Sequence, residues 1–424
     1  MRLKYGNDFI DVEIARHNIL GELKLEKRTS KSLDTVLKES ILNPIGRPRL
    51  VDLLRKNRPH DVVIIVSDGS RSIANYARIL RFLVSEIVDA GIDEKNIEFV
   101  IALGTHRRNS VEENKLLYGD LTADFHFSQH DCHNNCVSIG RTSTGLEVQV
   151  NKRIRNADFV VATGKINSHY LAGFSGGRKA VLPGISSYTT IRNNHCKLRR
   201  DGVALGAITN NIVAQEMDEA LRLFGINYLL NVVETPEHDT AQIFCGDAVF
   251  AFEQGLRVFR SLHSLVVSQK ADSAFISSGG YPKDRTFYLS HKSLNSAVTI
   301  VKKGGSLILI GQCREGFGDD RFVRYMLNSN LAGLLSYPEE KIEVGGHRAF
   351  ATAKILQDYK VYVLSDLISK ELNQMHFIPI KNIDEAIYRL RKDYGDRFTA
   401  YIIPNGTSIL ATVAHVSREE RRTI

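Results

Sequence analysis

The feature that most constrains this chain is the alternation of short β-branched runs with segments of helical period. Three runs in the first half of the chain are apolar almost throughout, which is typical of parallel strands buried on both faces. These predicted strands are Asp61–Val66, Asn96–Leu103 and Asp158–Thr163. An amphipathic helical segment that Gly91 can terminate separates the first two, and Ser110 with Glu113 forms a capping box for the next helix. This order predicts a doubly wound parallel sheet.

The alternation resumes later in the chain, which predicts a second domain. Strands are expected at Asp272–Ser277 and Ser306–Ile310, with a helix over Phe287–Lys302 between them. We therefore predict an α/β protein of two domains, each with a mainly parallel sheet flanked by helices, and an active site in the cleft between them. The predicted domains are an N-terminal cofactor-binding domain, 1–265, which 390–424 rejoins, and a substrate-side domain, 266–389.

Composition excludes several classes of protein. With 424 residues, of which 43% are hydrophobic and 25% charged, the chain has the composition of a globular protein. Its apolar runs are far shorter than the roughly 18 residues of a membrane span, and its N-terminus lacks the apolar core of a signal peptide. Five irregularly spaced cysteines favour a reducing cytoplasm. The net charge of +8 suits a small anionic ligand, and no basic stripe interleaved with aromatic residues indicates nucleic-acid binding.

Polar residues follow each of the first three predicted strands. Asp68 and Arg71 follow the first strand, His106 follows the second and His169 follows the third. Because ligands bind at the carboxyl ends of the strands of an open α/β sheet, these residues are expected to converge on one crevice. Arginine donates two parallel hydrogen bonds to a carboxylate, and histidine transfers protons near neutral pH. The pattern therefore favours a site that binds an acid and moves protons.

The third strand leads into a glycine-rich loop, Phe174–Lys179, in which small residues stand beside two cations. Such a loop can wrap a phosphate with its backbone N–H groups. It matches neither a Walker loop nor a dinucleotide-binding fingerprint, and a merely flexible basic loop is an equal alternative. The segment His126–Cys136 is rich in histidine and cysteine, but without a second ligand pair at zinc-finger spacing it favours a polar connection over structural zinc.

Several motifs together resemble the nickel-dependent lactate racemase family from end to end of the chain. In the first domain they are SDGSR (Ser67–Arg71), LGTHR (Leu103–Arg107), HYLAGFSGGRK (His169–Lys179) and Asn194-His195. In the second domain they are Gly280-Tyr281-Pro282-Lys283-Asp284 and Tyr288 with Lys292.

The resemblance implies a cofactor, the Ni(II) complex of pyridinium-3,5-bisthiocarboxylic acid mononucleotide, which is called the nickel-pincer nucleotide. Lys179 would be joined covalently to a thioacid group of this cofactor, and His195 would be the metal ligand that the protein supplies. Soft sulfur donors with one imidazole suit nickel. The other residues implied in cofactor binding lie in two loops and are Asp68, Gly69, Ser70, Arg71, Ser175, Gly176 and Gly177.

For the reaction, the resemblance implies that His106 and His169 act as alternating base and acid on the two sides of a 2-hydroxyacid. The Cα hydride would move to the cofactor and back by way of a bound 2-keto acid. Arg71, Tyr288 and Lys292 would bind the substrate. The implied partners are the small 2-hydroxyacid and the proteins that synthesise the cofactor, with a homodimer as a candidate assembly and neither nucleic acid nor membrane.

Departures from the family pattern bear on the substrate. Leu289 stands where the lactate enzymes carry Gln, Arg285-Thr286 replaces a more neutral pair, and His291 precedes Lys292. These changes remove an amide donor and add positive charge, so malate or a sugar acid is as well supported as lactate. Two alternatives remain, namely a cofactor-independent racemase or hydrolase that uses the two histidines, and a protein that binds a phosphorylated nucleotide without turnover.

Overall fold

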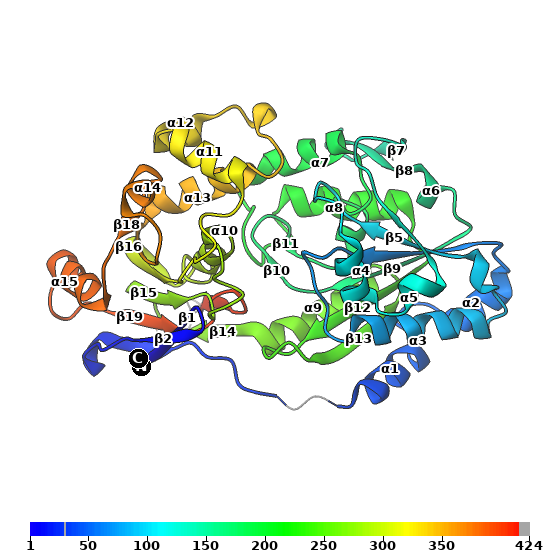
Figure 1. Ribbon diagram of the computed structural model, residues 1–424, viewed down its shortest axis with the longest axis horizontal. Helices are drawn as coiled ribbons and strands as arrows, with labels where there is room; N and C mark the ends of the chain where they lie inside the picture. Colours follow the sequence, from blue (N-terminus) through cyan, green and yellow to red (C-terminus); the bar gives the residue numbers. More distant parts are fainter. Residues whose placement is uncertain (29–30, 415–424) are drawn as a thin grey trace, which may run out of the picture. The chain divides into compact units, whose positions relative to one another are not determined.

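The computed structural model describes residues 1–28 and 31–414. The chain divides into two compact units, shown in Figure 1. We call Lys27–Leu262 the central unit, and Met1–Glu26 together with His263–Ile424 the terminal unit. Each unit is an α/β layer structure built on its own six-stranded sheet, as the sequence predicts.

The central sheet contains the three strands predicted from the apolar runs. Its six strands are, in spatial order, β13 (Thr240–Gly246), β12 (Tyr228–Glu234), β9 (Phe159–Lys165), β4 (Val62–Ser67), β5 (Ile97–Ala102) and β6 (His126–Gln129). Neighbours are parallel except β13, which runs antiparallel to β12. Because β9, β4 and β5 are adjacent and parallel, their carboxyl ends lie at one edge, as expected.

Helices cover both faces of the central sheet. Figure 1 shows α2 (Leu50–Asn57) and α3 (Tyr76–Asp89) on one side, and α7 (Tyr188–His195) and α8 (Ile212–Phe224) on the other. The apolar face of α3 is fully buried, and the predicted capping box at Ser110 begins α4 (Val111–Tyr118). The remaining elements of this unit are α1 (Leu33–Leu42), α5 (Leu121–Asp124), α6 (Lys152–Arg155), α9 (Phe250–His263), the hairpin β7 (Cys136–Arg141) and β8 (Glu147–Asn151), the pair β10 (Ser168–His169) and β11 (Gly173–Phe174), and the helical turn η3 (Gly177–Ala180).

The terminal sheet is parallel throughout. Its strands are, in spatial order, β18 (Ile378–Pro379), β17 (Lys360–Leu364), β16 (Val301–Ile310), β15 (Ala271–Ser277), β19 (Ala400–Ile403) and β3 (Ile19–Glu22). The other elements of this unit are the hairpin β1 (Arg2–Tyr5) and β2 (Asp8–Asp11), the pair β14 (Ser264–Val267) and β20 (Leu410–Val413), the helices α10 (Phe287–Ser290), α11 (Asp320–Asn328), α12 (Leu331–Ser336), α13 (His347–Asp358), α14 (Ser369–Gln374) and α15 (Ile383–Tyr394), and the helical turn η5 (His291–Ser296).

The predicted return of 390–424 to the N-terminal domain is wrong for the residues that the structure describes, and 415–424 lie outside them. Strand β19 pairs with β15 and β3, and β20 pairs with β14. The first 26 residues also belong to the terminal unit rather than to the predicted domain 1–265. A strand's partners are set by sheet edges elsewhere in the fold, so the local pattern of β19 carried no information about them.

The predicted helix over Phe287–Lys302 is confirmed only over Phe287–Ser296, where it is two short elements, and is wrong beyond them. Helix α10 ends at Ser290, the turn η5 follows, and Lys302 already lies in β16. Serine hydroxyls in this segment bond to nearby backbone carbonyls, Ser293 to Ser290 over 2.6 Å and Ser296 to Ser293 over 2.7 Å. Such local bonds compete with the helical ladder and favour short turns.

Among residues 1–28 and 31–414, none of the helices combines the length and the apolar character needed to cross a lipid bilayer.

Candidate active site

Asp68, at the carboxyl end of β4, connects several residues that the sequence predicts for the site. Its side chain is 1% exposed, and Oδ2 lies 2.7 Å from Nδ1 of His106 and 3.7 Å from the Arg71 guanidinium. Ser70 donates to Oδ1 from its backbone N–H and from Oγ. The loops that follow β4 and β5 therefore meet at one carboxylate, as the position of their strands predicts.

The charge of Asp68 determines which nitrogen of His106 carries the hydrogen. Burial raises the pKa of the Asp68 carboxyl, but the hydrogen bond with His106 and the charge of Arg71 outweigh burial, and the pKa falls to about 2. An ionised carboxylate can only accept, so Nδ1 of His106 donates to it and Nε2 carries the lone pair. His106 thus has the tautomer that a general base needs.

Two residues that the sequence did not single out hold the loop after β4 in place. Lys165, at the end of β9, donates from Nζ to the Ser72 carbonyl over 2.6 Å and to Glu234 over 3.0 Å. Glu234, at the end of β12, accepts the backbone N–H of Ala74 over 2.9 Å. Both partners are largely buried, so this ion pair fixes the backbone just beyond Arg71. No local pattern marked them, because their partners are distant in sequence.

His169, the second predicted proton-transfer residue, lies on β10 and is half-buried. Its Nδ1 accepts the backbone N–H of Leu171 over 3.3 Å and of Ala172 over 3.1 Å. A neutral ring in this position carries its hydrogen on Nε2. His169 is therefore arranged as a hydrogen-bond donor, whereas His106 is arranged as a base.

The loop that carries His106 is connected to the segment after Lys179. Gly104 donates its N–H to the carbonyl of Gly184 over 2.9 Å. Gly104 has a φ of +55°, and a Cβ there would lie 3.3 Å from the carbonyl oxygen of Pro183, so both the backbone conformation and the close approach favour glycine. This contact joins the loop after β5 to the loop after β9, as the predicted convergence requires.

The glycine-rich loop does not present the free N–H groups that the sequence predicted for a phosphate. Ser175 donates its N–H to Asn167 O over 2.8 Å, and Gly177 donates its N–H to Oδ1 of the buried Asn231 over 2.8 Å. Lys179 donates its N–H to Gly176 O over 3.1 Å. At these three positions the prediction of a phosphate cradle is wrong, because the tight turn uses the donors internally. The turn is enforced by Gly177, where φ is +48° and a Cβ would lie 2.8 Å from the Phe252 ring.

The loop is anchored through Arg178, which is 1% exposed. Its Nη1 donates to both carboxylate oxygens of Asp218 on α8 over 2.9 Å, and Nη2 donates to the Ala172 carbonyl over 2.8 Å. A two-pronged bond of this kind fixes orientation as well as position. It holds the backbone of Lys179, whose side chain is 7% exposed.

His195, the predicted metal ligand, ends α7 and is 7% exposed. Its Nδ1 lies 3.1 Å from Oδ1 of Asn194, whose Nδ2 in turn donates to the buried Glu216 over 2.8 Å. Because the amide oxygen only accepts, Nδ1 of His195 donates to it, and in the neutral ring Nε2 then carries the lone pair. Polar partners that orient a ligating imidazole in this way are characteristic of metal sites.

Within the described ranges, no group of three or more histidine, cysteine, aspartate or glutamate side chains could hold a metal ion. The defined orientation of the His195 ring fits the one imidazole that the nickel-pincer nucleotide would take from the protein.

The predicted substrate-side residues belong to the terminal unit. Tyr288 lies on α10 and Lys292 on η5, and Nζ of Lys292 is 5.9 Å from the centroid of the Tyr288 ring. Leu289 is half-buried beside them.

Three more of the predicted cofactor-binding residues lie in the loops of the central unit. Gly69 donates its N–H to Oδ1 of Asn109 over 3.0 Å, and Ser175 donates from Oγ to the Lys165 carbonyl over 2.9 Å. Gly176 packs so closely against Asn231 that a Cβ there would lie 2.7 Å from its Oδ1.

Two of the substitutions that the sequence linked to substrate charge are explained by local contacts. Arg285 is half-exposed and lies 3.9 Å from the Glu315 carboxylate. His291 is 3% exposed and stacks on Phe322. Burial, followed by the charges of Arg348 and Lys292, holds the pKa of His291 well below its usual range, so this ring is neutral. His291 therefore adds no cation to the site.

Two family models match the chain. Residues 5–206 match the model described as lactate racemase N-terminal domain, and residues 266–411 match the model described as lactate racemase C-terminal domain. A lactate racemase from Thermoanaerobacterium thermosaccharolyticum is 30% identical over 424 residues, which cover 97% of this chain and 98% of that protein. A lactate racemase from Lactiplantibacillus plantarum is 30% identical, covering 96% of this chain and 98% of that protein.

Solved structures agree with these matches. The structure of the lactate racemase apoprotein from T. thermosaccharolyticum aligns with a TM-score of 0.89 and 30% identity over 97% of this chain and 99% of that one. A crystal structure of a protein from Thermotoga maritima aligns with a TM-score of 0.63 and 15% identity over 88% of this chain and 100% of that one, which shows the fold alone.

Proposed function

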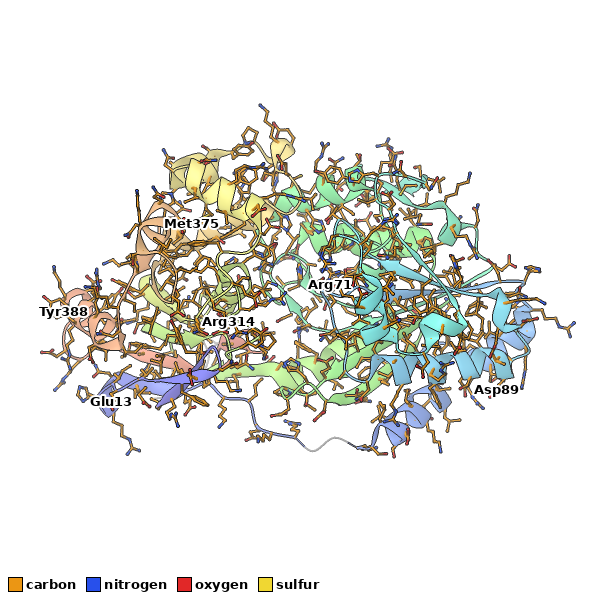
Figure 2. All side chains as sticks on the ribbon, viewed as in Figure 1. Glu13, Arg71, Asp89, Arg314, Met375 and Tyr388 are labelled. Carbon is orange, nitrogen blue, oxygen red and sulfur yellow. The ribbon has the colours of Figure 1, made fainter. Side chains whose placement is uncertain are left out.

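The chain belongs to the lactate racemase family and is an isomerase, and from that premise we propose that it racemises or epimerises a 2-hydroxyacid at Cα. The observation that carries this proposal is the buried carboxylate of Asp68, which contacts both His106 and Arg71. Through it His106, which we propose as the general base, and Arg71, which we propose as the carboxylate ligand and which Figure 2 labels, are held at the same carboxylate. A 2-hydroxyacid needs both, because a proton must leave its hydroxyl group while its carboxylate is held.

His106 is proposed as the base for one enantiomer. Its Nε2 takes the hydroxyl proton, and the imidazolium that forms is stabilised by the ionised Asp68 at Nδ1. Asp68 itself stays ionised, because its pKa is about 2. The carboxylate thus orients the ring before the proton moves and stabilises its charge afterwards.

His169 is proposed as the acid and base for the other enantiomer. To deliver a proton as an imidazolium, a histidine carries hydrogens on both nitrogens. Nδ1 of His169 would then have to release the N–H groups of Leu171 and Ala172 that it now accepts. We therefore propose that His169 first holds the substrate oxygen through Nε2–H. Nδ1 then takes a proton from solvent and gives up its backbone contacts, and Nε2 delivers its proton to the substrate oxygen, which leaves a neutral ring with its hydrogen on Nδ1.

Arg71, Tyr288 and Lys292 are the proposed ligands of the substrate. Arginine and lysine supply the positive charge that a carboxylate needs, and the tyrosine hydroxyl adds a hydrogen-bonding group.

Lys179 and His195 are proposed to hold the nickel-pincer nucleotide, Lys179 through a covalent bond and His195 through Nε2. The fixed tautomer of His195 and the anchored backbone of Lys179 support this assignment. When bound, this group supplies a pyridinium carbon that accepts the Cα hydrogen as hydride and returns it. The phosphate would rely on side-chain cations more than on the N–H groups that the turn already uses.

The function is tested with enantiopure 2-hydroxyacids and protein made in a host that synthesises the cofactor. In D₂O, the inverted product should keep protium at Cα, because hydride held on a carbon does not exchange with solvent, whereas a proton held by a histidine does. Substantial solvent deuterium at Cα would favour the cofactor-independent acid–base racemase instead.

The same preparation tests the attachment site. Peptide mapping should find the added mass on Lys179, and Lys179→Ala should remove both the adduct and turnover. Full activity of unmodified, nickel-free protein would contradict the assignment, and binding of the nucleotide with no turnover of any 2-hydroxyacid would favour a binding protein.

A further inference from the structure

Two cations of the terminal unit lie close to the ring of Tyr288. Nζ of Lys292 is 5.9 Å from the ring centroid, and the guanidinium carbon of Arg348, in the first turn of α13, is 4.4 Å from it. Both distances are in the range of cation–π contacts. Sixty residues separate Tyr288 from Arg348, so the motif that drew attention to Tyr288 and Lys292 could not show this second cation.

A hydrogen bond to the backbone of Tyr288 helps to hold Arg348 in this position. Its Nη1 donates to the carbonyl oxygen of Tyr288 over 3.3 Å, and its Nε is buried. The Tyr288 ring packs edge-on against Phe322 at 5.6 Å between centroids. The tyrosine, the arginine and the adjacent helix are therefore parts of one packed cluster rather than a chance surface contact.

The surroundings of this cluster are electropositive. Arg348 occupies the first turn of the 12-residue helix α13, where the helix dipole already favours anions over cations. The neutral His291 beside it contributes no charge of its own. Two cations placed together at an aromatic ring form a site that suits a ligand with more than one negative charge.

We infer that Arg348 binds a second carboxylate of the substrate while Lys292 binds the carboxylate next to the reacting carbon, so that the substrate class is the four-carbon 2-hydroxydicarboxylates. This inference rests on the proposed function, which assigns Tyr288 and Lys292 to the substrate. The two carboxyl carbons of such an acid lie about 4 Å apart when the chain is extended. With hydrogen bonds of about 3 Å at each end, such an acid reaches two cations that share one ring.

The residue that follows Tyr288 supports the same preference. Leu289 cannot donate a hydrogen bond, so the neutral amide of the lactate enzymes is absent beside Tyr288. Arg285 is half-exposed and lies 3.9 Å from the Glu315 carboxylate, whereas the Arg348 guanidinium lies over the Tyr288 ring itself.

The test compares malate with 2-hydroxybutyrate, which has the same chain length but no second carboxylate. We expect the loaded wild-type enzyme to prefer malate in kcat/KM. Arg348→Gln should lower kcat/KM for malate by roughly 10- to 100-fold, the worth of a hydrogen bond to a charged group, and should change 2-hydroxybutyrate less than about threefold. Arg348→Lys should lose less than Arg348→Gln for malate.

Arg324→Gln is the matched control. Arg324 also lies over a tyrosine ring, 5.8 Å from the centroid of Tyr325, and pairs with Glu343 in the same unit. It should leave both substrates unchanged. A wild-type enzyme that prefers 2-hydroxybutyrate, or an Arg348→Gln variant that loses both substrates equally, would overturn the inference.

A binding measurement separates the inference from the proposed function. In protein made without the cofactor, succinate should raise the melting temperature of the wild type more than butyrate does, and Arg348→Gln should abolish that difference. If no 2-hydroxyacid is turned over but this difference depends on Arg348, the proposed function fails and the dicarboxylate site stands. A succinate effect that is absent from the wild type, or unchanged in Arg348→Gln, rejects the dicarboxylate site.

Discussion

Asp68 shows how one buried side chain can organise a site made from residues far apart in the sequence. Desolvation alone would favour its protonated form, yet the imidazole of His106, the guanidinium of Arg71 and the hydroxyl of Ser70 keep it ionised. In return, the carboxylate selects the tautomer of His106. The two effects depend on each other, so Asp68 and His106 should be analysed as a pair.

We expect Asp68→Asn to lower kcat by at least about 100-fold, because an amide cannot stabilise the imidazolium form of His106 and can donate to Nδ1, which moves the hydrogen to Nε2. Steady-state kinetics with either enantiomer would measure the loss. Asp93→Asn, at an exposed carboxyl that pairs with Lys95, is the control and should retain wild-type kcat. A kcat for Asp68→Asn within threefold of the wild type would contradict the assigned role.

The same substitution should change how stability depends on pH. The pKa of Asp68 is lowered to about 2 in the folded protein, from an ordinary value near 3.8. Its contribution, about 2 kcal/mol by linkage, is therefore present above pH 4 and lost as the pH falls towards 2. Urea unfolding measured between pH 5 and pH 2 should show that the free energy of unfolding falls less steeply with decreasing pH in Asp68→Asn than in the wild type.

At the scale of elements, the position of Lys179 depends on the contact between η3 and α8. Arg178 is almost completely buried, and Asp218 on α8 is the carboxylate that neutralises it. The tight turn before it leaves Lys179 on a backbone with little freedom, since Gly177 packs against Phe252 and donates to Asn231. The lysine is thus positioned by the bonds that its neighbours Gly177 and Arg178 make to β12 and α8.

We expect Asp218→Ala to destabilise the protein by about 3 kcal/mol, because it leaves the buried guanidinium of Arg178 without its carboxylate. Denaturant unfolding measures this loss. Asp124→Ala, which removes a half-exposed ion pair with Arg81, is the matched control and should cost less than about 1 kcal/mol. Equal losses in the two variants would show that burial of Arg178 does not decide the stability of this contact.

At the scale of the whole molecule, the terminal unit is assembled from both ends of the chain. Strand β3 from the first 26 residues forms an edge of its sheet beside β19, and Leu3 and Val12 are buried in its core. The central unit has its own sheet and core and is continuous in sequence. The two units should therefore respond differently to a change at the N-terminus.

Deletion of residues 1–26 should lower the unfolding temperature of the terminal unit. It removes β3 and so exposes the edge of β19, and it removes Leu3 and Val12 and so exposes the apolar surface that these residues cover. Scanning calorimetry should then show an early transition for the terminal unit, while the central unit keeps its own. The Leu3→Ala variant should also lower the unfolding temperature of the terminal unit, but by less than the deletion does. We expect it to reduce the free energy of unfolding by about 2–4 kcal/mol. A single transition displaced as a whole would instead show that the two units unfold together.

Much of the architecture follows from the local pattern of residues. The strands β4, β5 and β9 were predictable because a continuous apolar run needs burial on both faces, whatever surrounds it. The capping box at Ser110 was predictable because its partners are three residues apart. The family motifs marked the loops after these strands for the same reason, since each motif is short and continuous.

Other features depend on contacts that no local pattern encodes. Strand β19 could pair with any exposed parallel edge, and its neighbours β15 and β3 lie far away in the chain. The N–H groups of the glycine-rich loop looked free until Asn231 and Asn167 accepted them. Arg348 reaches Tyr288 only because α13 packs beside α10 in the folded unit. Hydrogen-bond partners and the balance of charge are properties of the space around a group, and folding alone brings those neighbours together.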